Sequence, residues 1–313
     1  MKILITGASG FLGRALTKSL QEQGHIITGV NSKNCDLTRD CSLEQFNQDQ
    51  FDQIYHLAAW TQAGDFCLYH PGEQWLVNQK INTNVLSWWQ HSQPQAKLIA
   101  MGTSCAYDPQ YLLSEENYLK GEPIESFIGY GMTKRMLLYG LMSLSRQFKM
   151  EYLYLIPSTL YGPYYHTDGR QLHFIFDLIR KILRGTYYGE PVVLWGDGEQ
   201  KRELIHVQDF IHIMTKLVKT EKNAVINIGE GQEHSIKEFA QMICSHVGYS
   251  FDQILFDQSK YVGARSKVLS TQKVKSLLPE FQLRDLEKGL SETIEWFKEC
   301  HFKAMLSSSG LES

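Results

Sequence analysis

Long apolar runs and an excess of one charge are both missing from this sequence. No stretch approaches the roughly 20 consecutive apolar residues of a membrane-spanning helix. The 34 acidic and 31 basic residues leave a net charge of −3, so we expect neither a membrane nor nucleic acid as the main partner. The first apolar run enters a glycine turn at residue 7, too early for a signal peptide, and we expect a cytoplasmic protein.

Cysteine pairs, repeats and linkers are missing as well. The six cysteines form no CxxC pair and no zinc-ligand spacing, so the sequence predicts no metal site. Reduced thiols in a reducing compartment are the plain interpretation for all except Cys105. The others are Cys35, Cys41, Cys67, Cys244 and Cys300. The 313 residues suffice for one large domain or two unequal ones, and we expect a polar tail over residues 306–313 to fray.

Short apolar runs alternate with amphipathic segments through the first half of the chain. Strands are predicted over residues 2–6, 25–30, 53–57, 97–101 and 152–156. Helices are predicted over residues 11–23, over a stretch ending near Trp89, and over residues 131–148. This alternation predicts an α/β fold with a doubly wound, mostly parallel Rossmann sheet.

The character of the sequence changes after Pro157, where residues 160–200 become rich in Gly, Tyr and His. One helix is predicted over residues 172–184 and another beyond Ser235, whereas a strand at 225–228 suggests a return to the sheet. We therefore expect a dinucleotide-binding domain of residues 1–160 with a return segment at about 205–232. The remaining residues, 161–204 and 233–305, would form a smaller, C-terminal substrate-binding lobe.

Three glycines with the spacing GxxGxxG follow the first predicted strand: Gly7, Gly10 and Gly13. Glycine permits a tight turn and lets the backbone approach a pyrophosphate, which the N-terminus of the next helix stabilises. At the first strand–helix turn, this spacing predicts a dinucleotide site. The other loop residues that we expect to take part are Ser9, Phe11 and Leu12.

The second strand ends without the Asp or Glu that usually holds the ribose 2′-hydroxyl of NAD. Asn31, Ser32 and Lys33 stand there instead, and Lys33 could pair with a 2′-phosphate. The sequence therefore favours NADP, with NAD still possible. Lys33 could also be a solvated loop lysine. Asp36 could accept a hydrogen bond from the adenine amine, and Leu37 follows it in the same expected site.

Tyr130 and Lys134 are spaced i, i+4, which places both on one face of the predicted helix. A nearby ammonium favours the phenolate, so we expect Lys134 to lower the pKa of Tyr130. The phenol could then exchange a proton with a carbonyl or alcohol oxygen while hydride moves to or from the nicotinamide. Thr103 and Ser104 follow the strand at 97–101, at the edge where such sheets place their chemistry. One of their hydroxyls would hydrogen-bond the reacting oxygen.

Together these motifs resemble the extended short-chain dehydrogenase/reductase family of nucleotide-sugar enzymes, also described as NAD-dependent epimerases/dehydratases. The resemblance covers about residues 1–300 and also rests on residues 56–59, Asn84, and residues 161–163, 202–209 and 227–229. It implies an NAD(P)-dependent enzyme. It further implies dinucleotide contacts from Leu57, Ala58, Ala59, Tyr130, Lys134 and Pro157.

Within this family, residues 101–107 and the segment at His173 resemble the GDP-L-fucose synthases, which epimerise and reduce GDP-4-keto-6-deoxy-mannose. The resemblance implies that Cys105 and His173 act as acid and base at C3 and C5, beside a C4 ketone, and that Thr103 replaces a catalytic serine. A ketone acidifies neighbouring protons, which a thiol and an imidazole can remove and return. Asp108, where the family has Pro, leaves the exact sugar open.

The same resemblance implies a GDP-linked substrate, bound by Ser104, Cys105, His173, Trp195 and Arg202. A guanidinium such as that of Arg202 suits a diphosphate, whereas Trp195 could stack near the base or belong to the core. Weaker phosphate candidates are Arg180, Lys181 and Arg184, and weaker sugar candidates are Tyr164, Tyr165 and His166.

Family members commonly dimerise through two helices, here those around residues 85–89 and 131–148. Five apolar residues of the second helix favour a homodimer or else a wide internal face: Leu137, Leu138, Leu141, Met142 and Leu144. Other functions stay open. The protein could be an epimerase that keeps its dinucleotide bound, a plain 4-keto reductase in which Cys105 and His173 are idle, a 4,6-dehydratase, or a non-catalytic dinucleotide sensor.

Overall fold

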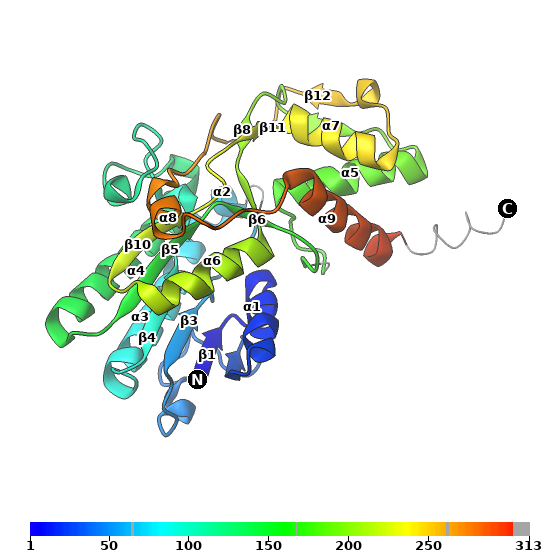
Figure 1. Cartoon of the computed structure of the whole chain (residues 1–313). Coiled ribbons are helices and arrows are strands. Elements are labelled where there is room, and N and C mark those ends of the chain that lie inside the picture. Colours follow the sequence, from blue (N-terminus) through cyan, green and yellow to red (C-terminus); the bar gives the residue numbers. More distant parts are fainter. Residues whose placement is uncertain (64–65, 167, 261–262, 303–313) are drawn as a thin grey trace.

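A parallel sheet of six strands forms the centre of the larger lobe (Figure 1). The computed structural model describes residues 1–63, 66–166, 168–260 and 263–302, so the expected tail lies outside the described residues. The strand order is β10-β5-β4-β3-β1-β2, and every pair is parallel. The strands are β1 (Lys2–Thr6), β2 (Ile26–Val30), β3 (Gln53–His56), β4 (Lys97–Met101), β5 (Tyr152–Pro157) and β10 (Ala224–Ile228). The predicted doubly wound fold is confirmed.

Helices cover both faces of this sheet, because successive side chains of each strand point to opposite sides. Ile3 and Ile5 join the core beneath α1 (Phe11–Glu22) and α6 (Val207–Thr220). Leu4, between them, joins the core beneath α3 (Pro71–Ser92) and α4 (Ile128–Phe148). The short apolar strands are thus buried on both faces, as a doubly covered parallel sheet requires.

The smaller lobe has its own hydrophobic core, built mainly between three helices (Figure 1). These are α5 (Phe174–Tyr188), α7 (Ile236–Val247) and α9 (Leu286–His301). Two short strand pairs complete the lobe: β7 (Val193–Trp195) with β12 (Leu255–Asp257), and β8 (Lys201–Arg202) with β11 (His234–Ser235). The chain passes between the lobes through the parallel pair β6 (Thr159–Tyr161) and β9 (Leu204–His206). Two short helices, α2 (Phe66–Tyr69) and α8 (Gln272–Leu277), complete the main elements.

Two helices begin elsewhere than the sequence predicted, and both differences affect the site. Helix α4 begins at Ile128 instead of residue 131, so Tyr130 lies in its first turn. Helix α5 begins at Phe174 instead of residue 172, and His173 is its N-cap with an extended backbone (φ −59°, ψ 152°). His173 is therefore held at a helix end and not on a helical face.

The apolar residues taken as a sign of dimerisation in α4 face the interior, so that part of the prediction is wrong. Leu137, Leu138 and Leu141 are at most 1% exposed, and Met142 and Leu144 pack partly against the same core. A different stripe of α4, formed by Met132, Met136 and Tyr139, is exposed. No helix among the described residues is both long and apolar enough to cross a membrane.

Candidate active site

The glycine loop makes a turn that only glycine can make. Gly7 has φ +69°, and a Cβ atom there would lie 2.9 Å from the amide nitrogen of Ala58. A Cβ atom on Gly13 would lie 2.2 Å from the carbonyl oxygen of Gly7. The N-cap of α1, Gly10, offers no side-chain cap to the first amides of the helix. This tight loop with free helix amides fits the pyrophosphate of a dinucleotide.

Neighbouring strands bring the other predicted dinucleotide residues to the same edge of the sheet. β3 lies between β1 and β4, and β5 follows β4, so their carboxyl ends adjoin. Ala58 and Ala59 follow β3, and Pro157 ends β5. Beside Pro157, the hydroxyl of Ser158 is buried without a hydrogen-bond partner among the described residues. An orphaned buried hydroxyl at this edge is compatible with a bound polar group.

The loop after β2 surrounds a pocket of about 400 Å³. Its lining includes Ser32, Lys33 and Arg39, which together suit a 2′-phosphate. Arg39 was missed from the sequence, although it lies only three residues beyond Asp36. Asn31 turns back to accept from the amide of Lys33 at 2.9 Å.

Asp36 and Leu37 serve the loop itself. The carboxylate of Asp36 accepts from the hydroxyl of Thr38 at 2.7 Å and pairs with Arg39, and the Thr38 hydrogen bonds lower the pKa of Asp36. Leu37 is buried, and its carbonyl accepts from Asn84 at 2.9 Å. These contacts shape the pocket, and they assign Asn84 a structural role within it.

Tyr130 and Lys134 lie one helical turn apart in α4. The Lys134 ammonium is 5.7 Å from the centre of the Tyr130 ring. Lys134 is 3% exposed, and burial lowers its pKa to about 8. Burial also raises the pKa of Tyr130, with the neighbouring Cys105 acting in the same direction. The expected lowering of the Tyr130 pKa is therefore wrong for this state, because desolvation disfavours the phenolate and is the largest influence on this pKa.

The segment after β4 carries the predicted hydroxyl and thiol. Thr103 caps the short 3₁₀ helix Ser104–Ala106, and its hydroxyl accepts from the amide of Cys105 at 3.2 Å. Ser104 is buried, whereas Cys105 is half-buried. The Sγ atom of Cys105 accepts a hydrogen bond from the ammonium of Lys267 at 3.1 Å. No motif or spacing in the sequence indicated Lys267, which lies 162 residues further along the chain.

His173 enters from the smaller lobe, where an aromatic cluster holds it. The Tyr165 ring stacks on Phe176 at 3.9 Å between centroids and lies 6.0 Å from the His173 ring. Phe11, of the glycine loop, meets Tyr165 edge-on at 5.1 Å. His173 keeps an exposed surface, yet the protein atoms around it lower its pKa by desolvation, and the charge of Lys267 acts in the same direction. His173 is thus neutral at neutral pH and can accept a proton.

The residues predicted to bind the nucleotide differ in whether a carboxylate already pairs with them. Trp195 is 42% exposed, and the Lys181 ammonium lies 5.6 Å from its ring centre. Arg202 donates to the carbonyl of Ala264 at 2.7 Å, which ties it to the segment that carries Lys267. The weaker phosphate candidates already pair with carboxylates: Arg180 and Lys181 with Asp177, and Arg184 with Glu190.

Among the weaker sugar candidates, Tyr164 and Tyr165 contact residues of the larger lobe. Tyr165 belongs to the aromatic cluster, and His166 lies 3.5 Å from Asp168. Tyr164 is exposed, and its carbonyl accepts from Arg14, whose guanidinium also reaches the carbonyl of Ser9 at 2.6 Å. Arg14 therefore joins the glycine loop to the smaller lobe.

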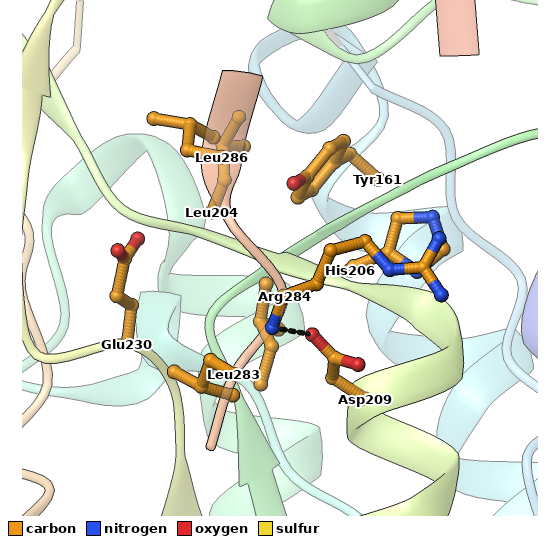
Figure 2. Close-up of a pocket in the computed structure, with 9 residues that line it drawn as sticks. Tyr161, Leu204, His206, Asp209, Glu230, Leu283, Arg284 and Leu286 are labelled. Atoms are coloured by element: carbon orange, nitrogen blue, oxygen red, sulfur yellow. Dashed lines mark hydrogen bonds between the residues drawn. The ribbon is translucent and has the colours of Figure 1, made fainter. Parts of the chain in front are cut away.

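A separate small cavity lies where α9 approaches β9 and α6 (Figure 2). Tyr161, His206 and Arg284 point into it, and the Arg284 amide donates to Asp209 at 2.8 Å. Its volume of about 10 Å³ corresponds to roughly one water molecule. The Nδ1 atom of His206 accepts from the amide of Gln208, which leaves its buried Nε2 without a partner among the described residues. This cavity is too small for a nucleotide sugar.

Comparison with known proteins places these features in a family. The profile of the NAD dependent epimerase/dehydratase family matches residues 3–229. A GDP-L-colitose synthase from Yersinia pseudotuberculosis is 29% identical over 95% of this chain and 98% of its own. A GDP-L-fucose synthase from Escherichia coli K12 is 28% identical over 95% and 97%.

Solved structures agree in fold. A GDP-L-fucose synthetase from Naegleria fowleri bound to NADP superposes with a TM-score of 0.83 at 25% identity, over 96% of this chain and 95% of its own. A GDP-mannoheptose C4 reductase from Campylobacter jejuni with NADP bound gives 0.82 at 23% identity, over 95% and 98%. The family expected from the motifs is thereby confirmed, and the chain belongs to the NAD dependent epimerase/dehydratase family.

Proposed function

We propose that the protein is an NADP(H)-dependent epimerase/reductase of a GDP-linked 4-keto sugar, similar to GDP-4-keto-6-deoxy-mannose. The observation that carries the proposal is the hydrogen bond from the ammonium of Lys267 to the sulfur of Cys105. This sulfur acts on Tyr130, and the same ammonium acts on His173. A plain reductase needs only a proton donor beside the dinucleotide. A thiol near that donor, and an imidazole under the influence of the same ammonium, match a reaction that also moves protons on carbon.

The glycine loop, Lys33 and Arg39 would hold NADPH by its pyrophosphate and 2′-phosphate. Bound NADPH supplies a hydride for the C4 carbon of the sugar. Tyr130 keeps its proton, because burial raises its pKa, and its hydroxyl is therefore suited to protonate the C4 oxygen. Lys134, fixed beside the ring, would stabilise the phenolate that remains.

Epimerisation would use the other two groups before the reduction. One group removes the proton from a carbon beside the ketone, and the C–H electron pair moves onto the C4 oxygen as an enolate. Thr103 and Tyr130 would donate hydrogen bonds to that oxygen. The second group protonates the carbon from the opposite face, and the ketone re-forms with inverted configuration. Cys105 and His173 exchange roles between C3 and C5.

Incubation with GDP-4-keto-6-deoxy-mannose and NADPH in D₂O tests both halves of the reaction. We expect NADPH consumption together with deuterium at C3 and C5, measured by absorbance and NMR. Consumption without deuterium would leave a plain reductase, and exchange without consumption would leave an epimerase. No reaction would refute the proposed substrate.

Two cysteine variants test whether Cys105 transfers protons to and from the sugar carbons. Cys105→Ser should lose most of the exchange and keep some reduction, because the serine hydroxyl is a much weaker acid than a thiol. Cys300→Ser, at an exposed cysteine of α9, is the matched control and should behave as wild type. Unchanged exchange in Cys105→Ser would contradict the role of Cys105.

We also propose a homodimer, formed through an exposed apolar face of α3 and α4. Met132, Met136 and Tyr139 follow one another at helical spacing and are 36%, 46% and 50% exposed. Trp75 and Leu76 of the neighbouring α3 are 42% and 55% exposed. Apolar side chains gathered over adjoining helices are typical of a protein interface.

The proposed chemistry of Cys105 also favours a reducing cellular compartment. A thiol that exchanges protons with a substrate has to stay reduced, as it does in the cytoplasm. We therefore place the enzyme there.

A further inference from the structure

Lys267 joins the two groups proposed to move protons on carbon. Its ammonium donates to the sulfur of Cys105 at 3.1 Å and lies 5.9 Å from the ring centre of Phe127. None of the ion pairs found among the described residues involves Lys267. Its charge therefore acts on the sulfur without a carboxylate to neutralise it.

The sulfur side of this contact is fixed by the larger lobe. The Thr103 hydroxyl holds the amide of Cys105. Arg135, which is 3% exposed, donates to the carbonyl of Ala106 at 2.8 Å and to the carbonyls of Lys120 and Gly121. The turn that carries Cys105 is thus clamped to α4, the helix of Tyr130.

The lysine side is fixed independently. Glu203, 2% exposed, accepts from the amide of Leu269 at 2.8 Å, and the amide of Ser270 donates to the carbonyl of Leu113 at 2.9 Å. On the other side of Lys267, the carbonyl of Arg265 accepts from Lys201 at 2.8 Å. Both partners are therefore anchored, and their approach is a property of the fold and not of one flexible side chain.

We propose that Lys267 is a positioning residue that holds the sulfur of Cys105 as a thiolate, the form that removes a proton from carbon. This inference rests on the proposed role of Cys105. An ammonium hydrogen bond stabilises a thiolate much more than a thiol. When the sulfur takes the proton from carbon it becomes a neutral thiol, while Lys267 keeps its charge.

The same ammonium also acts on His173. Desolvation by the surrounding protein is the main cause that lowers the pKa of His173, and the charge of Lys267 contributes in the same direction. For the two groups to invert a carbon between them, His173 has to take up a proton from water before the thiolate removes one from carbon, so that the imidazolium can protonate the opposite face. The resulting thiol and neutral imidazole then exchange roles at the second carbon.

Alkylation of the free protein by iodoacetamide tests the proposal without any sugar. The rate at Cys105, followed by peptide mass spectrometry at pH 7, should fall at least about tenfold in Lys267→Met, since one pKa unit corresponds to tenfold in thiolate. Lys267→Arg keeps the charge and should stay within about threefold of wild type. Lys260→Met, which removes an exposed lysine of the same lobe, is the matched control and should match wild type.

Cys41 and Cys300, the two exposed cysteines, serve as references within each molecule, and their rates should not change. If Lys267→Met does not fold by circular dichroism, Lys267→Gln replaces it. Unchanged alkylation of Cys105 in the neutral variant would overturn the proposal, as would an equal loss in Lys267→Arg. Because no sugar is present, this outcome is independent of whether the proposed substrate is correct.

Discussion

The buried lysine of the Tyr130 pair gives a sharp prediction for the pH dependence of reduction. Burial lowers the pKa of Lys134 from 10.5 to about 8. A shift of this size corresponds to about 3 kcal/mol against the ammonium in the folded protein. No carboxylate in the described part of the chain forms an ion pair with Lys134 to offset that cost, so its proton is lost at a much lower pH than that of an exposed lysine.

The rate should follow the protonated fraction of Lys134. With a pKa of about 8, this fraction falls roughly tenfold between pH 7 and pH 9, whereas an exposed lysine stays almost fully charged. We therefore expect kcat/KM for NADPH to fall about tenfold over that range. The assay is NADPH oxidation with the 4-keto sugar in a Cys105→Ser background, which removes the thiol from the profile.

Lys134→Arg is the informative variant. Its guanidinium stays charged throughout this range, so the fall above pH 8 should disappear even though the altered geometry lowers the rate at every pH. A flat wild-type profile up to pH 10, or the same fall in Lys134→Arg, would refute the assignment of this ionisation to Lys134.

Three further predictions concern the cofactor, the assembly and the fold. Lys33→Ala and Arg39→Ala should each weaken NADPH binding by about 1.5–3 kcal/mol and leave NADH within about twofold, measured by fluorescence titration, because a charged hydrogen bond to the 2′-phosphate is lost; equal losses for both dinucleotides would contradict the pocket. Met136→Glu should convert a dimer to a monomer in sedimentation velocity, whereas Leu255→Glu, at an exposed leucine of β12, should not; a wild-type monomer would exclude the interface. Burial raises the pKa of Glu203 to about 7, so its stabilising contribution is complete below about pH 4.5 and is lost as the pH rises through 7. Between pH 5 and pH 8 the wild type should lose about 2 kcal/mol of unfolding free energy relative to Glu203→Gln in urea titrations, and parallel curves would show that this carboxyl does not titrate.

Local chemistry explains why much of the site could be predicted. The glycine spacing, the i, i+4 pair of Tyr130 and Lys134, and the residue types after β4 each depend on neighbours in the chain. Their places at one edge of the sheet follow from the rule that parallel strands align their carboxyl ends. The structure places Thr103 and Cys105 on one turn next to Tyr130.

Residues whose partners lie far away in the chain could not be predicted from the sequence. Lys267 reaches Cys105 only because Glu203 and Leu113 hold its segment, and Arg14 reaches the smaller lobe only through a backbone carbonyl. The predicted lowering of the Tyr130 pKa was wrong for a similar reason. Spacing gives the distance to the ammonium, whereas the desolvation of the phenol depends on everything packed around it.

The sequence by itself determined the doubly wound sheet and the dinucleotide loop, and it predicted the side chains that we propose to transfer protons. Apolar periodicity and glycine spacing encode these features within a few residues of one another. Tertiary structure alone decided which apolar face of α4 is exposed, where α5 begins, and which cation meets the thiol. These depend on how the two lobes pack, because burial and charge pairing are set by residues far apart in the chain.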